Sequence, residues 1–195
     1  MDERRFTPRP EVLPQDTNWV DQVIDVTGWT RGRSGDIDWA AAETRLGTPL
    51  PAEYKELVAR FGYGAFDDHL CLMTVDGPPE SIDIVEFNEF WSRSSAPDGE
   101  GPWEPYRLYP APGGLLQWAS TERRIAFYWL TEGADPDLWP ILVTDDAYAQ
   151  WHRFDGSTAQ FVHRMLTDPR HPYSTAVHFD SHSFTPYTSP TTEEE

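Results

Sequence analysis

The feature that most constrains this fold is a series of short runs rich in aromatic and β-branched residues in the second half of the chain. The runs cover residues 115–119, 124–130, 139–144 and 149–154. Residues of these types favour extended strands, and turn-like segments such as TER and EGADPD separate the runs. Strands joined by short turns pair with their neighbours in antiparallel fashion. The pattern therefore predicts an antiparallel meander.

Five other segments carry the apolar spacing of amphipathic helices. They lie near residues 19–28, 36–46, 51–62, 81–94 and 157–168. Asp36 is the predicted N-cap of the second helix, and Ser157 with Gln160 forms a capping box for the last. Residues 70–75 are predicted to form a further strand, and 106–109 a short one inside a long Pro- and Gly-rich loop.

The length of 195 residues suits one domain, which we place at residues 16–168. Residues 1–15 contain several prolines and no apolar period, so we expect a flexible arm. Residues 169–195 are rich in Ser, Thr, Pro and His, so we expect a mobile tail that folding does not need. Tyr173, Val177 and Phe179 are the residues of this tail that could dock on the body.

The chain is strongly acidic, with 33 Asp and Glu against 15 Lys and Arg and a formal net charge of -18. Such a field repels nucleic acid and anionic lipid and steers a basic partner inward. Acidity that serves only solubility is an alternative that composition leaves open. The absence of a long apolar stretch, of a signal peptide and of any cysteine besides Cys71 predicts a cytoplasmic protein without a membrane span.

Motifs for catalysis, nucleotides or metals do not stand out. The sequence has no GxxxxGK[ST], GxSxG or HExxH pattern, and the glycines at 62 and 64 follow a helix as its stop. His178 and His182 share a helical spacing without an evident third ligand. We therefore predict no catalytic residue, no cofactor and no metal, and a protein that is not an enzyme.

Charge is instead concentrated where aromatic residues are frequent. Residues 64–106 hold ten acids with only Arg93 opposing them, and residues 132–146 hold five acids and no base. Aromatic anchors ringed by charge suit a protein interface. The alternative, that the aromatics are core and the acids a solvated face, stays open. The candidate partner-binding residues are Asp67, Asp68, Glu86, Glu89, Trp91 and Trp103.

The segment LGTPLPAEYKELVARFGYGAFDDHLCLM at 46–73 resembles the leading motif of the SUKH superfamily, the Smi/Knr-type fold. In that family an acidic residue and Leu-Gly precede Leu-Pro, an amphipathic helix, a Gly-rich stop and a strand. The matching residues are Glu43, Leu46, Gly47, Leu50, Pro51, Tyr54, Leu57, Gly62, Gly64 and Leu70. Residues 125–145 and 151–166 are similar to the family's later strands and closing helix.

This resemblance implies an α+β domain, with a mainly antiparallel sheet packed with N-terminal helices and a C-terminal helix. It also implies a non-catalytic binding protein without a cofactor. The implied role is bacterial immunity, in which the protein binds and neutralises a polymorphic or contact-dependent toxin, often a nuclease. A regulatory scaffold, as in fungal relatives linked to cell-wall synthesis, is the alternative, and an undetected enzyme is a more distant one.

Overall fold

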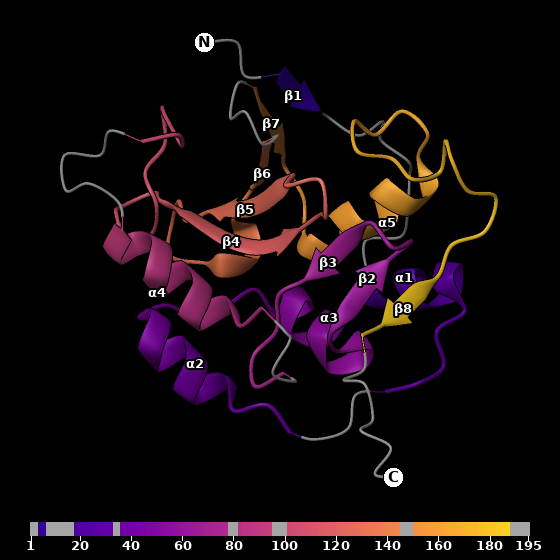
Figure 1. The fold of residues 1–195 in the computed structure, drawn as a ribbon, viewed down its shortest axis with the longest axis horizontal. Coiled ribbons are helices and arrows are strands. Elements are labelled where there is room, and N and C mark those ends of the chain that lie inside the picture. The colour runs from indigo at the N-terminus through magenta and orange to yellow at the C-terminus, as the bar shows by residue number, and fades with distance from the viewer. Residues whose placement is uncertain are drawn as a thin grey trace, which may run out of the picture.

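The protein is an α+β domain, seen here in a computed structural model that describes residues 4–6, 18–32, 36–77, 82–94, 101–144 and 150–187. Figure 1 shows α2 and α4 side by side near one end of the sheet, with α1, α3 and α5 toward the other. In chain order the elements are β1 (Arg4–Phe6), α1 (Trp19–Thr27), α2 (Trp39–Leu46), α3 (Ala52–Phe61), β2 (Gly64–Phe66), β3 (Leu70–Leu72), α4 (Ile84–Ser94), β4 (Leu115–Ser120), β5 (Ala126–Leu130), the 3-10 helix η1 (Pro136–Leu138), β6 (Ile141–Thr144), β7 (Trp151–Phe154), α5 (Thr158–Thr167) and β8 (Phe184–Pro186).

The strands form one sheet in the order β1-β7-β6-β5-β4-β3-β2-β8. Every neighbouring pair is antiparallel except β1 and β7, which are parallel. Strands β4 to β7 are consecutive in both chain and sheet, so the predicted meander is confirmed. The predicted α+β class with a mainly antiparallel sheet is confirmed as well.

The central strands are buried on both faces. In β5, Phe127 and Trp129 belong to the larger core, into which α1, α3 and α5 also pack, while Tyr128 and Leu130 belong to a smaller core on the other face. The half-buried Trp103, Tyr106 and Leu108 of the segment after α4 cover that second core. Adjacent strand residues point to opposite faces. A strand that is hydrophobic at every position therefore needs cover on both sides.

The helix ends mostly follow the sequence signals. Ser157 Oγ accepts a hydrogen bond from the Gln160 amide at 3.3 Å, which confirms the N-cap of α5. Gly47 ends α2 in the left-handed conformation, at φ 77°. The predicted start of α2 is wrong by two residues, because Asp38 and not Asp36 accepts from the Ala41 amide, at 2.9 Å.

The first strands differ more from prediction. Strand β3 is three residues long, shorter than the predicted 70–75, because the chain leaves the sheet after Leu72. Strand β2 was not predicted, since its Gly64 was interpreted as part of a helix stop. Within 106–109 the structure has a single bridge, between Leu108 and Leu115, in place of a strand.

The C-terminal segment is part of the domain, so the predicted boundary at residue 168 is wrong. Strand β8 pairs with β2, and Phe184 packs at 5.0 Å from both Phe61 and Phe66. A Cβ on Gly64 would meet the Thr185 carbonyl oxygen and the Phe184 ring, so only glycine permits this close approach. Tyr173 also packs against the larger core. Residues 188–195 lie outside the described residues.

Asp67 holds this segment in place from the β2–β3 turn. Its side chain is only 2% exposed. One carboxylate oxygen accepts from Thr175 Oγ1 at 2.6 Å and lies 2.8 Å from His182 Nδ1, and the other accepts from the Ser183 amide at 3.0 Å. One carboxylate thus satisfies three groups of residues 170–187, which lack a regular element except β8.

The predicted N-terminal arm is corrected over a short stretch only. Residues 4–6 form β1, which lies beside β7 at the edge of the sheet. The rest of residues 1–15 lies outside the described residues. Among the helices that the structure describes, none has the length and apolar content needed to cross a membrane.

We predict that Asp67→Asn destabilises the fold by about 1 to 3 kcal/mol, because an amide NH2 would face donors that now reach a carboxylate oxygen. Asp68→Asn is the matched control, because Asp68 has a similar positive φ but is exposed. Asparagine tolerates that backbone conformation, so neither substitution adds backbone strain. Urea unfolding of Asp67→Asn and Asp68→Asn gives the free energy of unfolding of each variant for comparison with wild type. Equal stability of the two variants would contradict the role given to Asp67.

His171 is a buried titratable group beside the same segment. It is 4% exposed and lies between rings, 4.9 Å from Phe161, and its Nδ1 accepts from the Tyr173 amide at 3.2 Å. Burial lowers the pKa of His171 from 6.5 to about 4; the nearby Asp168 opposes this shift, and Arg164 adds to it. The imidazole is therefore neutral in the folded protein at neutral pH.

We predict that this neutral imidazole makes the fold sensitive to acid. Between pH 6.5 and about 4 the unfolded chain binds a proton at His171 that the folded chain does not. Stability contributed by the neutral form is thus complete above pH 6.5 and falls toward pH 4, by about 3 kcal/mol in total. In His171→Gln, chemical unfolding across this pH range should show a shallower fall. The same slope in His171→Gln, wild type and the exposed control His178→Gln would refute the assignment.

Candidate partner-binding site

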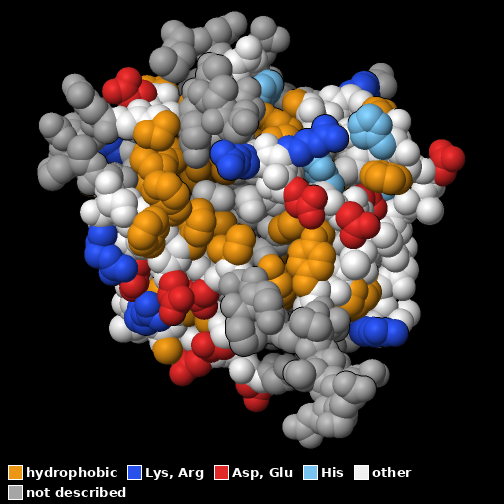
Figure 2. Space-filling model, in the orientation of Figure 1, with side chains coloured by type: hydrophobic (Ala, Val, Ile, Leu, Met, Phe, Trp, Pro, Cys, Tyr) orange, Lys and Arg blue, Asp and Glu red, His pale blue; other side chains and the backbone are white. Residues whose placement is uncertain are grey.

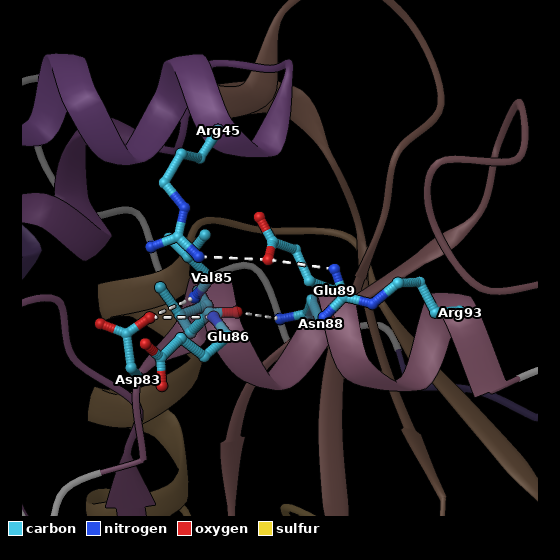
Figure 3. Close-up of polar contacts among 8 residues, drawn as sticks. Arg45, Asp83, Val85, Glu86, Asn88, Glu89 and Arg93 are labelled. Atoms are coloured by element: carbon cyan, nitrogen blue, oxygen red, sulfur yellow. Dashed lines mark hydrogen bonds and ion pairs between the residues drawn. The ribbon is translucent and has the colours of Figure 1, made fainter.

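Helix α4 carries the candidate site, and its first turn is capped by a carboxylate. Asp83 Oδ1 accepts from the amides of Val85 at 2.8 Å and Glu86 at 3.0 Å (Figure 3). Capping satisfies amides that have no partner within the helix. The inward side of the helix buries Ile84, Val85 and Asn88, while Glu86 and Phe90, four residues apart, lie on its exposed side.

Asn88 fixes α4 to the sheet at Gln117, where β4 still pairs with β5 on one side but no longer has β3 on the other. Its Nδ2 donates to the Gln117 carbonyl at 2.9 Å and its Oδ1 accepts from the Gln117 amide at 2.9 Å. The β4–β5 register shifts between Gln117 and Ala119, and β3 pairs with β4 only through Ala119 and Ser120. The amide side chain thus replaces a missing strand, and it sets the position of α4 on the sheet.

Aromatic side chains gather on and beside the helix. Trp91 and Trp103 lie 5.7 Å apart in an edge-to-face arrangement, and Phe90 meets Trp91 at 5.4 Å. Phe90 is 57% exposed and Trp91 39%, which is high for residues of this size. Figure 2 shows hydrophobic side chains gathered over α4 and the segment beside it, with acidic and basic side chains just below. We call Glu86, Phe90, Trp91 and Trp103 the α4 surface.

The two predicted glutamates of α4 differ in their surroundings. Glu86 is exposed, and none of the ion pairs between described residues involves it. Glu89 Oε2 lies 3.1 Å from Arg45 of α2 and 3.5 Å from Arg93 of α4 (Figure 3). Its charge is therefore already balanced within the protein. The structure therefore favours Glu86 over Glu89 as the charge that a partner would meet, and the role of either in binding stays a prediction.

The two predicted aspartates lie away from the α4 surface. Asp67 and Asp68 line a different hollow, with His69, Arg123 and the C-terminal segment. Asp67 is buried and satisfied internally, so its predicted role in binding a partner is corrected to a structural one. Asp68 is exposed but separate from α4. The predicted binding residues therefore lie in two separate places, the aspartates in the hollow beside the C-terminal segment and the others on or beside α4.

The open question about the aromatic residues is answered one residue at a time. In the two acidic blocks, 64–106 and 132–146, Phe66 and Trp139 are buried in the core and Phe87, Trp103 and Tyr106 are half-buried. Phe90 and Trp91 are the exposed aromatic residues among the described residues of these blocks. Sequence reasoning did not select Phe90 as a site residue. Its spacing of four from Glu86 and three from Arg93 places it on the polar side of an amphipathic helix, and this signal could have identified it.

The second acidic block is used in part for the fold. Asp137 Oδ1 accepts from the Ala52 amide at 2.6 Å, at the start of α3. Glu132 Oε1 lies 2.6 Å from Arg153, which also contacts Asp155. Asp145 and Asp146 lie outside the described residues. This block is therefore a weaker candidate for a partner than the α4 surface.

Few side chains in the part of the chain that the structure describes are suited to act as a nucleophile or to bind a metal ion. Burial raises the pKa of the Cys71 thiol, whose Sγ lies 3.6 Å from Tyr187 Oη, so the less reactive protonated form is favoured. His182, one of the pair at helical spacing, is engaged by Asp67. Among the described residues no three His, Cys, Asp or Glu side chains are grouped so as to hold a metal ion.

Comparison of the chain with protein-family models, with curated proteins and with solved structures finds no match. The family resemblance carried by residues 46–73 and by the later strands therefore stays a prediction.

We predict that Asn88→Ala destabilises the protein by about 2 to 4 kcal/mol, because it leaves the buried amide and carbonyl of Gln117 without partners. Ser92→Ala, one turn further along the same helix, is the control, and it should change stability by less than about 0.5 kcal/mol. Urea unfolding of the two variants provides the measurement. A loss no greater in Asn88→Ala than in Ser92→Ala would remove Asn88 as the anchor of α4.

Proposed function

We propose that this chain is a non-catalytic, cytoplasmic binding protein that neutralises a basic toxin as its immunity partner, with the α4 surface as its contact. The observation that carries the proposal is the exposure of Phe90 and Trp91 on a helix whose unpaired acid, Glu86, lies one turn away. Large exposed aromatic residues are enriched at the centres of protein interfaces.

Rigidity supports this use of the surface. Trp91 packs against Trp103, whose Nε1 donates to Tyr128 Oη of β5 at 3.3 Å, and Asn88 ties the helix to β4. Side chains that are ordered before binding lose less conformational entropy when a partner arrives. Trp91, Trp103 and the backbone of α4 are thus already held in place before contact.

Charge supports a basic partner. The net charge of -18 creates a field that attracts a cationic protein from a distance. A nuclease toxin fits this requirement, because a protein that binds phosphates must present a cationic cleft. An inhibitor that covers such a cleft gains fast association and excludes the nucleic acid.

Several residues that carry the SUKH resemblance stabilise the fold through hydrogen bonds or special backbone conformations, and this supports the family proposal. Glu43 Oε1 accepts from the Leu50 amide at 2.9 Å and from Lys55 Nζ at 2.8 Å, and so joins the loop after α2 to α3. Gly47 needs its positive φ, and Gly64 the space of its missing side chain. A packing pattern of this kind can be shared by proteins with different surfaces.

The test begins with the proteins encoded beside this gene in its host, each expressed and purified for association kinetics. We predict that a basic toxin binds and that association slows by about 10- to 1000-fold as salt rises, because screening removes the steering field. Glu86→Lys should lower the association rate, and Phe90→Ser should raise the dissociation rate. Co-expression of wild type should restore growth to cells that make the toxin.

The control is Asp25→Lys, which reverses an exposed charge on α1, remote in sequence from α4. Unfolding curves of all variants should match wild type. If the association rate does not change with salt and falls equally in Glu86→Lys and Asp25→Lys, the α4 surface is not the contact. Failure of every neighbouring gene product to bind would count against the immunity role itself.

A further inference from the structure

A groove lies behind the α4 surface, between α4, the segment after it and strands β4 and β5. Its volume is about 390 Å³, within the range of about 300 to 1,000 Å³ that is usual for sites of small ligands. It is lined by Phe87, Asn88, Trp91, Trp103, Leu108, Gln117, Ser120, Thr121, Arg124, Ala126 and Tyr128.

Aromatic rings form the walls at one end of this groove. Trp91 and Trp103 meet edge to face at 5.7 Å, and Trp103 is held by its hydrogen bond to Tyr128. Phe87 lies 6.2 Å from Trp91 and extends the wall along α4. Faces and edges of such rings are favourable partners for a further flat ring. This end of the groove suits an aromatic group.

The other lining is polar and rich in hydrogen-bond donors. Ser120 and Thr121 supply hydroxyls, and Thr121 Oγ1 already accepts from the Ile125 amide at 3.2 Å, which leaves its own O–H to donate. Asn88 is fully used by its bonds to Ile84 and Gln117. Donors without acceptors favour an anionic group.

Arg124 supplies the charge at this polar end. Its guanidinium forms no hydrogen bond or ion pair with any residue that the structure describes, although the chain has 33 acids. Among the described residues of the lining none is acidic, so Arg124 is the single formal charge there. A cation entering the groove would meet a like charge, and an anion would meet an open partner.

Arg124 occupies the left-handed position of the turn between β4 and β5. Its φ is 61°, in the left-handed region that glycine and asparagine adopt more readily than arginine. The Arg124 amide donates to the Thr121 carbonyl at 3.0 Å, a turn that a shorter residue could form as well. Strained positions of this kind are concentrated at functional sites.

We propose that this groove binds a small planar aromatic anion, with its ring against Trp91, Trp103 and Tyr128 and its carboxylate or phosphate on Arg124. A guanidinium can bind either anion with two parallel hydrogen bonds. The ligand site adjoins the proposed contact with a protein partner. The two share Trp91 and Trp103, while Glu86 and Phe90 belong to the contact alone.

The test uses the full chain alone and three indole probes: indole-3-acetate as the anion, indole as the neutral ring and tryptamine as the cation. Phenyl phosphate, a fourth probe, shows whether a phosphate replaces the carboxylate. Calorimetric titration should give saturable binding of indole-3-acetate, at least about tenfold tighter than tryptamine, since a charged hydrogen bond is worth about this factor or more.

Two adjacent arginines allow a matched comparison. Arg124→Asn removes the guanidinium, suits the positive φ and should leave stability unchanged or raised, while affinity for indole-3-acetate falls about tenfold or more. Arg123→Asn changes the neighbouring residue, which lines the other hollow, and should leave binding unchanged. Trp103→Leu should weaken all three indole probes, because they share the ring.

The proposal is overturned by equal or tighter binding of tryptamine, by equal effects of Arg124→Asn and Arg123→Asn, or by no saturable binding of either anion in the millimolar range. No protein partner is needed for these titrations. Their failure therefore leaves the proposed immunity function untouched, and the failure of every neighbouring gene product to bind would leave this site standing.

Discussion

The rest of this structure depends on one constraint, the burial of the central strands on both faces. Tyr128 and Trp129 are neighbours in β5 and point to opposite sides of the sheet, yet they are 2% and 1% exposed. A single layer of helices could not bury both. The helices therefore cover one face, and the segment that contains Trp103, Tyr106 and Leu108 must cover the other. That segment carries no regular strand or helix, but it is as much a part of the core as the helices are.

The edges of the sheet impose the second constraint, because a strand without a neighbour leaves backbone groups exposed. Both edge strands come from the ends of the chain, β1 beside β7 and β8 beside β2. Where a strand of the sheet lacks a neighbour, side chains form hydrogen bonds with its free backbone groups. Asn88 satisfies both backbone groups of Gln117, and Asp67 satisfies a segment that has little secondary structure of its own. Two short polar side chains thus determine where α4 and the C-terminal segment lie.

The position of α4 has consequences for both proposed activities. The anchoring by Asn88 turns one side of the helix inward, so Phe90 and Glu86 are left on the outside. The same anchoring holds Trp91 near Trp103 and opens a groove toward Arg124. A protein contact on the outside and a ligand site behind it would therefore share one rigid support. Trp91 and Trp103, which both sites use, already pack against each other, so ordering them costs a ligand or a partner little entropy.

Local patterns in the sequence determined the helices, the meander and the α+β class, because alternation and helical spacing depend only on which residues are neighbours in the chain. They also selected Glu86, Trp91 and Trp103, which the fold places together on the α4 surface. Local patterns could not determine that β8 joins β2, because the two strands are more than a hundred residues apart and β8 is only three residues long. For the same reason the sequence treated Asp67 as a surface charge, and it did not single out Arg124 as the cation of a groove. Whether a charge is buried, balanced or open is decided by segments that arrive from elsewhere in the chain, and only the tertiary structure brings those segments together.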